Sequence, residues 1–273
     1  MLKAAGLTFG YDARTPVLND VSLTVPADAI VGILGPNGSG KTTLLRMLAG
    51  TRQPQRGSTT LDGAVLSALP RAALARRVAV VPQETQLAFD YTVGEVAMMG
   101  RYAHLAAFAI EGPLDIAAVD EALASTGTLH LKSRLFATLS GGEKQRVVIA
   151  AALAQIAGDR EGPASRYLLL DEPTASLDLA YQLEIATLLT RLHEQRRAGI
   201  VISTHDISLA GTMCDTLLLL RDGVVVASGA TDDVLTTENL RRVYGVDAEI
   251  SRHPSGQRVV VPLRRLPQDG PRA

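Results

Sequence analysis

The most informative segment of this chain is a glycine-rich loop at residues 35–43, which reads Gly35-Pro36-Asn37-Gly38-Ser39-Gly40-Lys41-Thr42-Thr43. Its spacing fits the pattern G-x-x-x-x-G-K-[ST], in which backbone N–H groups, a lysine and a hydroxyl surround nucleotide phosphates and Mg²⁺. The apolar run at 29–34 predicts a strand buried on both faces, and the unbroken stretch 41–49, which ends at Gly50, predicts a helix. Because this motif requires a strand before it and a helix after it, the sequence predicts a nucleotide site.

Composition is that of a globular protein. The chain has 273 residues, of which 47% are apolar and 20% charged, enough for one large or two modest domains. A formal net charge of -1 provides no overall attraction to nucleic acid or anionic lipid, so we expect no nucleic-acid partner. The single cysteine, Cys214, has no partner for an internal disulfide, and its apolar neighbours predict an inert buried thiol in a reducing compartment.

Neither a secretory signal nor a membrane span is predicted. The first residues lead into a strand-like segment and lack the apolar region and cleavage site of a signal peptide. The longest apolar run, 147–154, is far shorter than the ~18 residues of a spanning helix. We therefore expect a protein that is not exported and that contacts a membrane only through another subunit.

The order of apolar runs predicts an α/β fold, in which a mainly parallel sheet is covered by helices. The period-two pattern at 18–25 predicts a half-buried strand in an antiparallel N-terminal layer. Further strands are predicted at 78–81, 167–171, 200–203 and 216–220.

Between about residues 90 and 158 the pattern changes to consecutive helices. Four apolar residues stand at approximate helical spacing, namely Leu114, Ile116, Val119 and Leu123. The segment 141–157 is apolar nearly all round, as a buried helix would be. This region therefore predicts a helical subdomain inserted into the α/β core.

We expect a single domain at 1–235 and a C-terminal extension at 236–273. The polar segment 158–165 has the composition of a loop that returns the chain to the sheet. The extension is expected to hold a short helix, a hairpin around Ser255-Gly256 and a mobile Pro/Gly-containing tail.

Within the glycine-rich loop, Gly38 and Gly40 allow the backbone to approach phosphates, and the following helix directs free N–H groups and a positive dipole end toward them. We expect Lys41 to lie on the β- and γ-phosphates. Thr42 would give its hydroxyl to Mg²⁺, and Thr43 would add a phosphate hydrogen bond.

A pair of carboxylates follows the apolar strand in Tyr167-Leu168-Leu169-Leu170-Asp171-Glu172-Pro173. Open α/β sheets place ligands beyond the carboxyl ends of their strands. We expect Asp171 to hold the Mg²⁺ shell and Glu172 to orient and polarise the attacking water. Solvated loop carboxylates are the alternative, which Pro173 and the following Ser176-Leu177-Asp178 make less attractive.

A third motif, Leu139-Ser140-Gly141-Gly142-Glu143, completes a set with residues 35–43 and 167–173, and with this set the chain resembles the ATP-binding cassette (ABC) ATPase family. Ser140 and the N–H groups of Gly141 and Gly142 open a helix, and a helix N-terminus is itself an anion site. The chain would then carry two phosphate-binding surfaces, so the resemblance implies a head-to-tail homodimer with each ATP between the loop of one copy and the signature of the other.

The resemblance also implies roles for four other residues. Tyr11 matches the aromatic residue that stacks on adenine, although simple packing remains its alternative. Gln83 matches the glutamine that contacts Mg²⁺ or the attacking water and links the core to the helical subdomain. His205 matches the histidine that senses the γ-phosphate, and Asp178 the aspartate that contacts the opposite subunit. Four other histidines are expected to be surface or packing residues, namely His104, His130, His193 and His253.

Three uses of ATP stay open at this point: an importer subunit, an exporter or lipid-moving subunit, and a soluble ATPase of DNA repair or translation. The interval 43–139 is of ordinary size, without the long coiled-coil insertion typical of the third class. The segment 89–104 resembles the "TV…V…GR(Y)PH" segment of importers of iron–siderophore, haem and vitamin B12, with Ala103 in place of the usual proline. Segments 177–182 and 244–250 are also similar to that group.

The importer reading implies two separate transmembrane permease subunits, a substrate-binding protein, and a peripheral position on the cytoplasmic face of the cell membrane. An apolar surface around 91–99 would receive the membrane subunit. The transported substrate itself is not predicted, because an ATPase subunit of this kind does not contact its cargo.

Overall fold

The computed structural model describes residues 1–12, 15–106, 108–158, 165–175, 177–195, 198–254 and 257–266. These residues form two compact units. The first unit consists of Met1–Leu2, Pro26–Asp28 and Thr60–Val201, and the second of Lys3–Val25, Ala29–Thr59 and Ile202–Ala273. The boundary expected at 235/236 stays a prediction.

The second unit begins with the N-terminal strands. β1 (Leu2–Phe9) and β2 (Leu18–Val25) are sheet neighbours, and β4 (Arg56–Leu61) follows on the other side of β1. Val17 donates its backbone N–H to Phe9 O at 2.7 Å, which closes the hairpin between β1 and β2. Four residues of β2 are buried at nearly alternate positions, as its period-two pattern predicts.

The core strands of the second unit stand in the order β10-β9-β3. β3 (Ile30–Leu34) is buried at every residue and runs parallel to β9 (Thr216–Arg221), with Val31 opposite Thr216. β10 (Val224–Ala230) is antiparallel to β9. The helices are α1 (Lys41–Leu48) and α7 (Ile207–Met213). Gly50, at φ 70°, ends the α1 segment as predicted.

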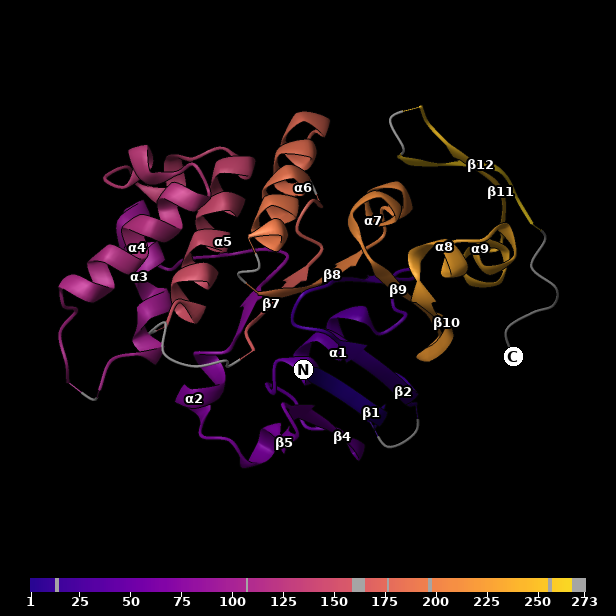
Figure 1. Cartoon of the computed structure of the whole chain (residues 1–273), viewed down its shortest axis with the longest axis horizontal. Helices are drawn as coiled ribbons and strands as arrows, with labels where there is room; N and C mark the ends of the chain where they lie inside the picture. The colour runs from indigo at the N-terminus through magenta and orange to yellow at the C-terminus, as the bar shows by residue number, and fades with distance from the viewer. Residues whose placement is uncertain are drawn as a thin grey trace. The chain divides into compact units, whose positions relative to one another are not determined.

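The chain after residue 230 adds two short helices and a hairpin to the second unit (Figure 1). The elements are α8 (Thr231–Val234), α9 (Thr237–Tyr244), β11 (Val246–Arg252) and β12 (Arg258–Arg265). β11 and β12 pair antiparallel, so both strands of the predicted hairpin are present. Its turn at Ser255-Gly256, the loop residues 159–164 and the expected tail at 267–273 lie outside the described residues.

The strands of the first unit include β6 (Val78–Val81) and β7 (Tyr167–Asp171), which are parallel neighbours with Val81 opposite Leu170. β7 is buried at every residue, and β8 (Gly199–Thr204) lies next to it in the strand order. Smaller elements precede them: β5 (Ala64–Val65), η1 (Leu66–Ala68) and α2 (Arg71–Ala75). Helix α6 (Leu179–Glu194) follows β7.

The first unit also holds the predicted helical region, drawn in magenta in Figure 1. It consists of α3 (Val93–Met99), η2 (Gly100–Ala103), α4 (Pro113–Ser125), η3 (Leu129–Leu131), η4 (Phe136–Thr138) and α5 (Gly141–Ile156). Val119 and Leu123 of α4 are buried, but Leu114 is 80% exposed and Ile116 45% exposed. Because residues 114 and 116 are two apart, they point to different sides of the helix, so the four apolar residues do not form one buried face.

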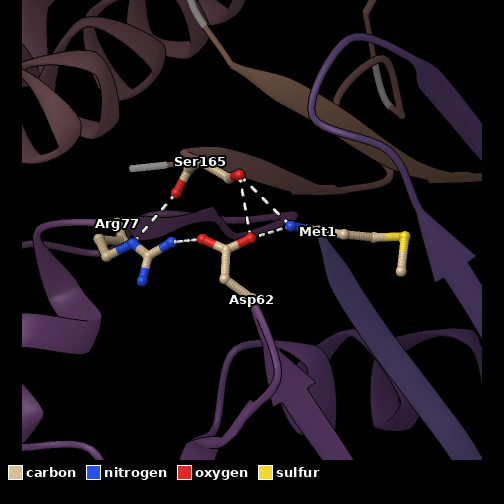
Figure 2. Close-up of polar contacts among 4 residues, drawn as sticks. All are labelled: Met1, Asp62, Arg77 and Ser165. Carbon is tan, nitrogen blue, oxygen red and sulfur yellow. Dashed lines mark hydrogen bonds and ion pairs between the residues drawn. The ribbon is translucent and has the colours of Figure 1, made fainter. Parts of the chain in front are cut away.

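A polar cluster joins four segments of the first unit (Figure 2). The Asp62 carboxylate forms ion pairs with the Met1 ammonium and the Arg77 guanidinium. Ser165 donates its hydroxyl to Asp62 Oδ1 at 3.1 Å and accepts from Arg77 Nε at 3.1 Å on its backbone oxygen. Arg77 and Ser165 precede β6 and β7, so the cluster braces the amino ends of the strands whose carboxyl ends hold the predicted site.

Candidate functional site

The glycine-rich loop lies in the second unit between β3 and α1. Lys41 opens α1 and is only 6% exposed. Its Nζ donates to Gly35 O at 2.9 Å and to Pro36 O at 3.3 Å. The lysine ammonium therefore lies against the carbonyls of its own loop, where it supplies a positive charge next to the N-terminus of α1.

Glycine stands at two positions of the loop, 38 and 40, for different physical reasons. Gly38 has φ 80°, and a β-carbon there would meet nothing within 4 Å. Gly40 has φ 104°, and a β-carbon there would lie 2.7 Å from Leu18 Cδ2 and 2.9 Å from Val17 O. The open side of Gly38 therefore suits a close phosphate, whereas Gly40 is required by backbone conformation and by packing on β2.

Ser39 supplies an unsatisfied donor at the same place. The residue is 2% exposed, and its hydroxyl is buried with no hydrogen-bond partner among the described residues. Its backbone oxygen accepts from Gly223 N at 3.2 Å, which fixes the loop against the β9–β10 turn. Because a buried hydroxyl without a partner is costly, the loop fits a ligand with acceptor oxygens, such as a phosphate chain.

Tyr11 forms hydrogen bonds with α1, the helix that follows the glycine-rich loop. Its hydroxyl lies 3.3 Å from Thr43 Oγ1 and accepts from Arg46 Nη1 at 3.3 Å. The hydrogen bond with Thr43 makes the largest contribution to lowering the Tyr11 pKa. Arg52 lies 5.9 Å from the ring centroid, and the residue is 55% exposed. An anchored, exposed ring is what stacking on a base requires, but sequence reasoning missed both arginines.

His205 is exposed and lies between the end of β8 and the start of α7. Its position is set by the next residue, because Asp206 caps α7 by accepting from Leu209 N at 2.9 Å, and donates its own N–H to Thr204 Oγ1 at 3.0 Å. His104, in contrast, is half-buried and donates to Gln155 O at 2.7 Å, and burial lowers its pKa. His104 thus has the packing role expected of it.

In the first unit, the parallel pair β6 and β7 delivers Gln83 and the two carboxylates to one sheet edge. Asp171 is 8% exposed at the end of β7, and Gln83 is exposed two residues after β6. Glu172 has φ 47°, in the left-handed region that costs a non-glycine residue ~1–3 kcal/mol and that clusters at functional sites. The sequence carried no signal for this conformation.

The signature segment begins α5 with a reciprocal cap. Ser140 Oγ accepts from Glu143 N at 3.3 Å, and Glu143 Oε2 accepts from Ser140 N at 2.8 Å. This backbone hydrogen bond is the main reason that the Glu143 pKa is lowered. A carboxylate performs this capping as well as an amide, which explains physically why glutamate is acceptable at the position.

Gly142 of the signature lies against helix α6. A β-carbon there would lie 2.2 Å from Tyr181 Cδ1, and one on Gly141 would lie 3.3 Å from Leu177 Cδ2. Asp178 caps α6 by accepting from Tyr181 N at 3.1 Å. The structure therefore connects two separately predicted residues, Gly142 and Asp178, through Tyr181, a residue that sequence reasoning did not single out.

Each unit thus brings together part of the predicted set: the loop and Tyr11 in the second unit, and the signature with Asp178 in the first. The remaining assignments, among them Thr42, Gln83 and Asp171 as metal ligands, stay predictions. The phosphate loop, with its buried lysine and a serine hydroxyl that has no partner among the described residues, defines the chain as a nucleotide-binding protein of the P-loop class.

Comparison with known proteins gives the family. The ABC transporter family model matches residues 18–175. The chain is 43% identical over 258 residues to the hemin import ATP-binding protein HmuV of Bordetella pertussis, covering 93% of this chain and 95% of the relative. It is 39% identical over 252 residues to the cobalamin import ATP-binding protein BtuD of Halobacterium salinarum, covering 92% and 61%.

A solved structure agrees with these relatives. A metal-chelate type ABC transporter in an inward-facing conformation matches with a TM-score of 0.82 and 29% identity, over 96% of this chain and 97% of that one. The chain belongs to the ABC transporter family as an ATP-binding protein, and the predictions of the ABC ATPase fold and of an ATPase are confirmed. In the part of the chain that the structure describes, no helix is both long and apolar enough to cross a bilayer.

Proposed function

We propose that this chain is the ATP-hydrolysing subunit of an importer that takes up a haem, cobalamin or iron–siderophore type of chelate through separate membrane subunits. The observation that carries this proposal is the P-loop itself, where the buried Lys41 ammonium and the Ser39 hydroxyl, which finds no partner in the described part of the chain, suit a phosphate chain. Similarity to import ATP-binding proteins over more than nine-tenths of the chain supports the direction of transport.

For hydrolysis, Lys41 and the loop N–H groups bind the β- and γ-phosphates, and Tyr11 stacks on adenine. Thr42, Gln83 and Asp171 carry the oxygen ligands that Mg²⁺ prefers, and the ion would neutralise phosphate charge. Glu172 accepts the proton of the attacking water, and His205 contacts the γ-phosphate. The strained backbone of Glu172 supports its assignment as the base.

The signature supports a working homodimer. The first N–H groups of α5, at Gly141 and Gly142, have no partner one turn earlier in the helix and suit an anion. In the dimer they bind the γ-phosphate of the ATP held by the other copy, with Asp178 near the same contact. ATP then stabilises the pair of subunits, and loss of the γ-phosphate releases them.

The membrane subunits are proposed to dock on the helical region, which places the protein on the cytoplasmic face of the membrane. Four residues of the expected docking segment, Thr92, Gly94, Glu95 and Met98, line a groove of about 830 Å³. Ile116 and Leu129, which are 45% and 40% exposed, contribute apolar surface to the same groove, and Val119 lies beneath it. Its size and apolar lining support docking of a short helix from a permease.

Among the cargoes, haem is the first to test, because the hemin import relatives are 41–43% identical and the cobalamin relatives 39% identical. The test uses the ATPase with its permease subunits in proteoliposomes. A haem-loaded, cobalamin-loaded or siderophore-loaded binding protein is added, and phosphate release is measured with a Glu172→Gln complex as the blank. Stimulation by the haem-loaded protein is expected, whereas stimulation by none of the three would favour an exporter.

A further inference from the structure

The Gly100-Arg101 pair of the importer-like segment lies against the far end of the signature helix. A β-carbon on Gly100 would lie 2.1 Å from Ala151 O and 3.0 Å from Gln155 N, both in the backbone of α5. Only glycine allows η2 to approach α5 this closely. Close packing against α5 therefore requires glycine at position 100. The first residues of that same helix form the signature.

Arg101 occupies the C-terminal end of α5. The side chain is 9% exposed, and its Nη1 donates to Ala154 O at 2.9 Å and also to Ala157 O. The last carbonyls of a helix receive no hydrogen bond from within the helix, because no further turn supplies an N–H donor. A guanidinium, which carries several N–H donors and a positive charge, is well suited to satisfy them. His104 donates to Gln155 O, which lies between these two carbonyls in the sequence.

The same guanidinium is bound to a second helix. Arg101 Nε donates to Asp115 Oδ1 at 2.9 Å. The other carboxylate oxygen of Asp115 accepts from Gly112 N at 3.0 Å, at the start of α4. Through Arg101, one buried ion pair therefore connects η2, the start of α4 and the end of α5.

We propose that Arg101 is a positioning residue for the signature, because its bonds to Asp115 and to the last carbonyls of α5 fix the direction in which α5 points Ser140–Gly142. This inference rests on the proposed role of the signature in the dimer. The 16 residues of α5 span ~24 Å at 1.5 Å per residue, so a tilt of ~5° at the Arg101 end moves the signature by ~2 Å. A misplacement of about 1 Å costs on the order of 100-fold in rate at a catalytic contact.

The ion pair between Arg101 and Asp115 is better suited to orienting α5 than to stabilising the fold. A buried pair gains little over apolar packing, since its attraction offsets the cost of removing both charges from water, but a planar guanidinium makes several bonds in fixed directions. Lysine at 101 would keep the charge and lose the fork that contacts two helices at once. The inference therefore predicts different results for lysine and for an apolar side chain.

The test compares Arg101→Met and Arg101→Lys with Arg76→Met as the control. Arg76 Nε donates to Ala103 O at 2.7 Å, so it binds the same short helix through a backbone oxygen of η2 rather than of α5. Four quantities are measured for each purified chain: affinity of the monomer for a fluorescent ATP analogue, kcat of ATP hydrolysis, KM of ATP hydrolysis, and ATP-driven dimerisation in a Glu172→Gln background.

Arg101→Met is expected to lower kcat by at least ~10-fold and to weaken the ATP-driven dimer, while analogue affinity stays within ~2-fold because the loop is unchanged. Arg101→Lys is expected to give intermediate values, and Arg76→Met wild-type values. A folded Arg101→Met chain with wild-type kcat and wild-type dimerisation would overturn the inference.

A second variant and one control separate a failure of the Arg101 inference from a failure to fold or a failure of the proposed signature role. If Arg101→Met does not fold, Asp115→Asn decides instead, because the amide still accepts from Gly112 N while losing its charge, and a fall in kcat with unchanged analogue affinity is expected. If the Glu172→Gln chain with Arg101 intact fails to dimerise on ATP, the proposed signature role is wrong. If that chain dimerises and its Arg101→Met derivative does so equally well, only the inference about Arg101 is wrong.

Discussion

Gly142 of the signature lies so close to Tyr181 that a β-carbon on the glycine would be 2.2 Å from Cδ1 of the ring. Tyr181 belongs to the first turn of α6, which Asp178 caps at 3.1 Å. The signature and the cap of α6 are therefore one packed contact, and the shape of the proposed γ-phosphate surface depends on a ring that forms no part of either motif.

Gly142→Ala is expected to displace Tyr181 or the first turn of α5 and to lower kcat on the order of 100-fold, as about 1 Å of misplacement would. Thermal unfolding should change less than kcat does, because Tyr181 is only half-buried. The double variant Gly142→Ala with Tyr181→Ala should recover part of the lost activity. An undiminished defect in the double variant would show that the contact with Tyr181 is not the cause.

Tyr11 provides a second prediction. Tyr11→Phe keeps the stacking ring and loses the hydroxyl contacts with Thr43 and Arg46, so ATP affinity should stay near the wild-type value. Tyr11→Ala should weaken ATP binding ~10-fold, since stacking of a base on an aromatic ring contributes ~1–3 kcal/mol. Isothermal titration with ATP distinguishes the two, and equal affinities for both variants would argue for simple packing.

The Cys214 thiol is expected to be unreactive in the folded protein. It is 6% exposed and packed near Gly32 of β3, and burial raises its pKa to about 12. Iodoacetamide at pH 8 should leave the native chain unmodified, because the thiolate is the reactive form. Mass spectrometry should then show one carbamidomethyl group after unfolding in guanidinium. Rapid modification of the native chain would place the thiol at the surface.

Acid should weaken the contacts that the Asp115 carboxylate makes with Arg101 and with the Gly112 N–H, because protonation removes its charge. The Gly112 N–H and then Arg101 hold the pKa of this carboxyl below its usual range. Its contribution to stability is therefore fully present above the unfolded pKa of about 3.9 and is lost as pH falls through the lower folded value. The difference in unfolding midpoint between the wild-type chain and Asp115→Asn should be constant near neutral pH and should shrink below about pH 4. A constant difference down to pH 2 would contradict the assignment.

Several elements were predictable because each has a local pattern. The strand 78–81 and the buried strand 167–171 match β6 and β7 residue for residue, since continuous apolar runs between breakers define them. β10 was not predicted, because it is an antiparallel strand with exposed and half-buried residues and no clean alternation. The spacing of Leu114, Ile116, Val119 and Leu123 predicted a helix, but spacing alone does not specify which helix face is covered, and Leu114 and Ile116 are exposed.

For the candidate site, motif residues were found by their spacing, and the residues that hold them were not. Tyr181, Arg46 and Arg52 touch the site only because distant segments fold together. The left-handed backbone of Glu172 is likewise imposed by the chain around it, since glutamate has no preference for that conformation. Arg101 was noticed as part of a resemblance, but its partner Asp115 and the α5 carbonyls required the structure.

The most direct test of the proposed function is the behaviour of Glu172→Gln with ATP. The variant should bind ATP, lose most hydrolysis, and form a dimer that persists through size-exclusion chromatography, because the γ-phosphate stays between the loop of one copy and the signature of the other. Lys41→Ala should instead weaken nucleotide binding itself and remain monomeric. A Glu172→Gln chain that hydrolyses ATP at the wild-type rate would contradict the mechanism.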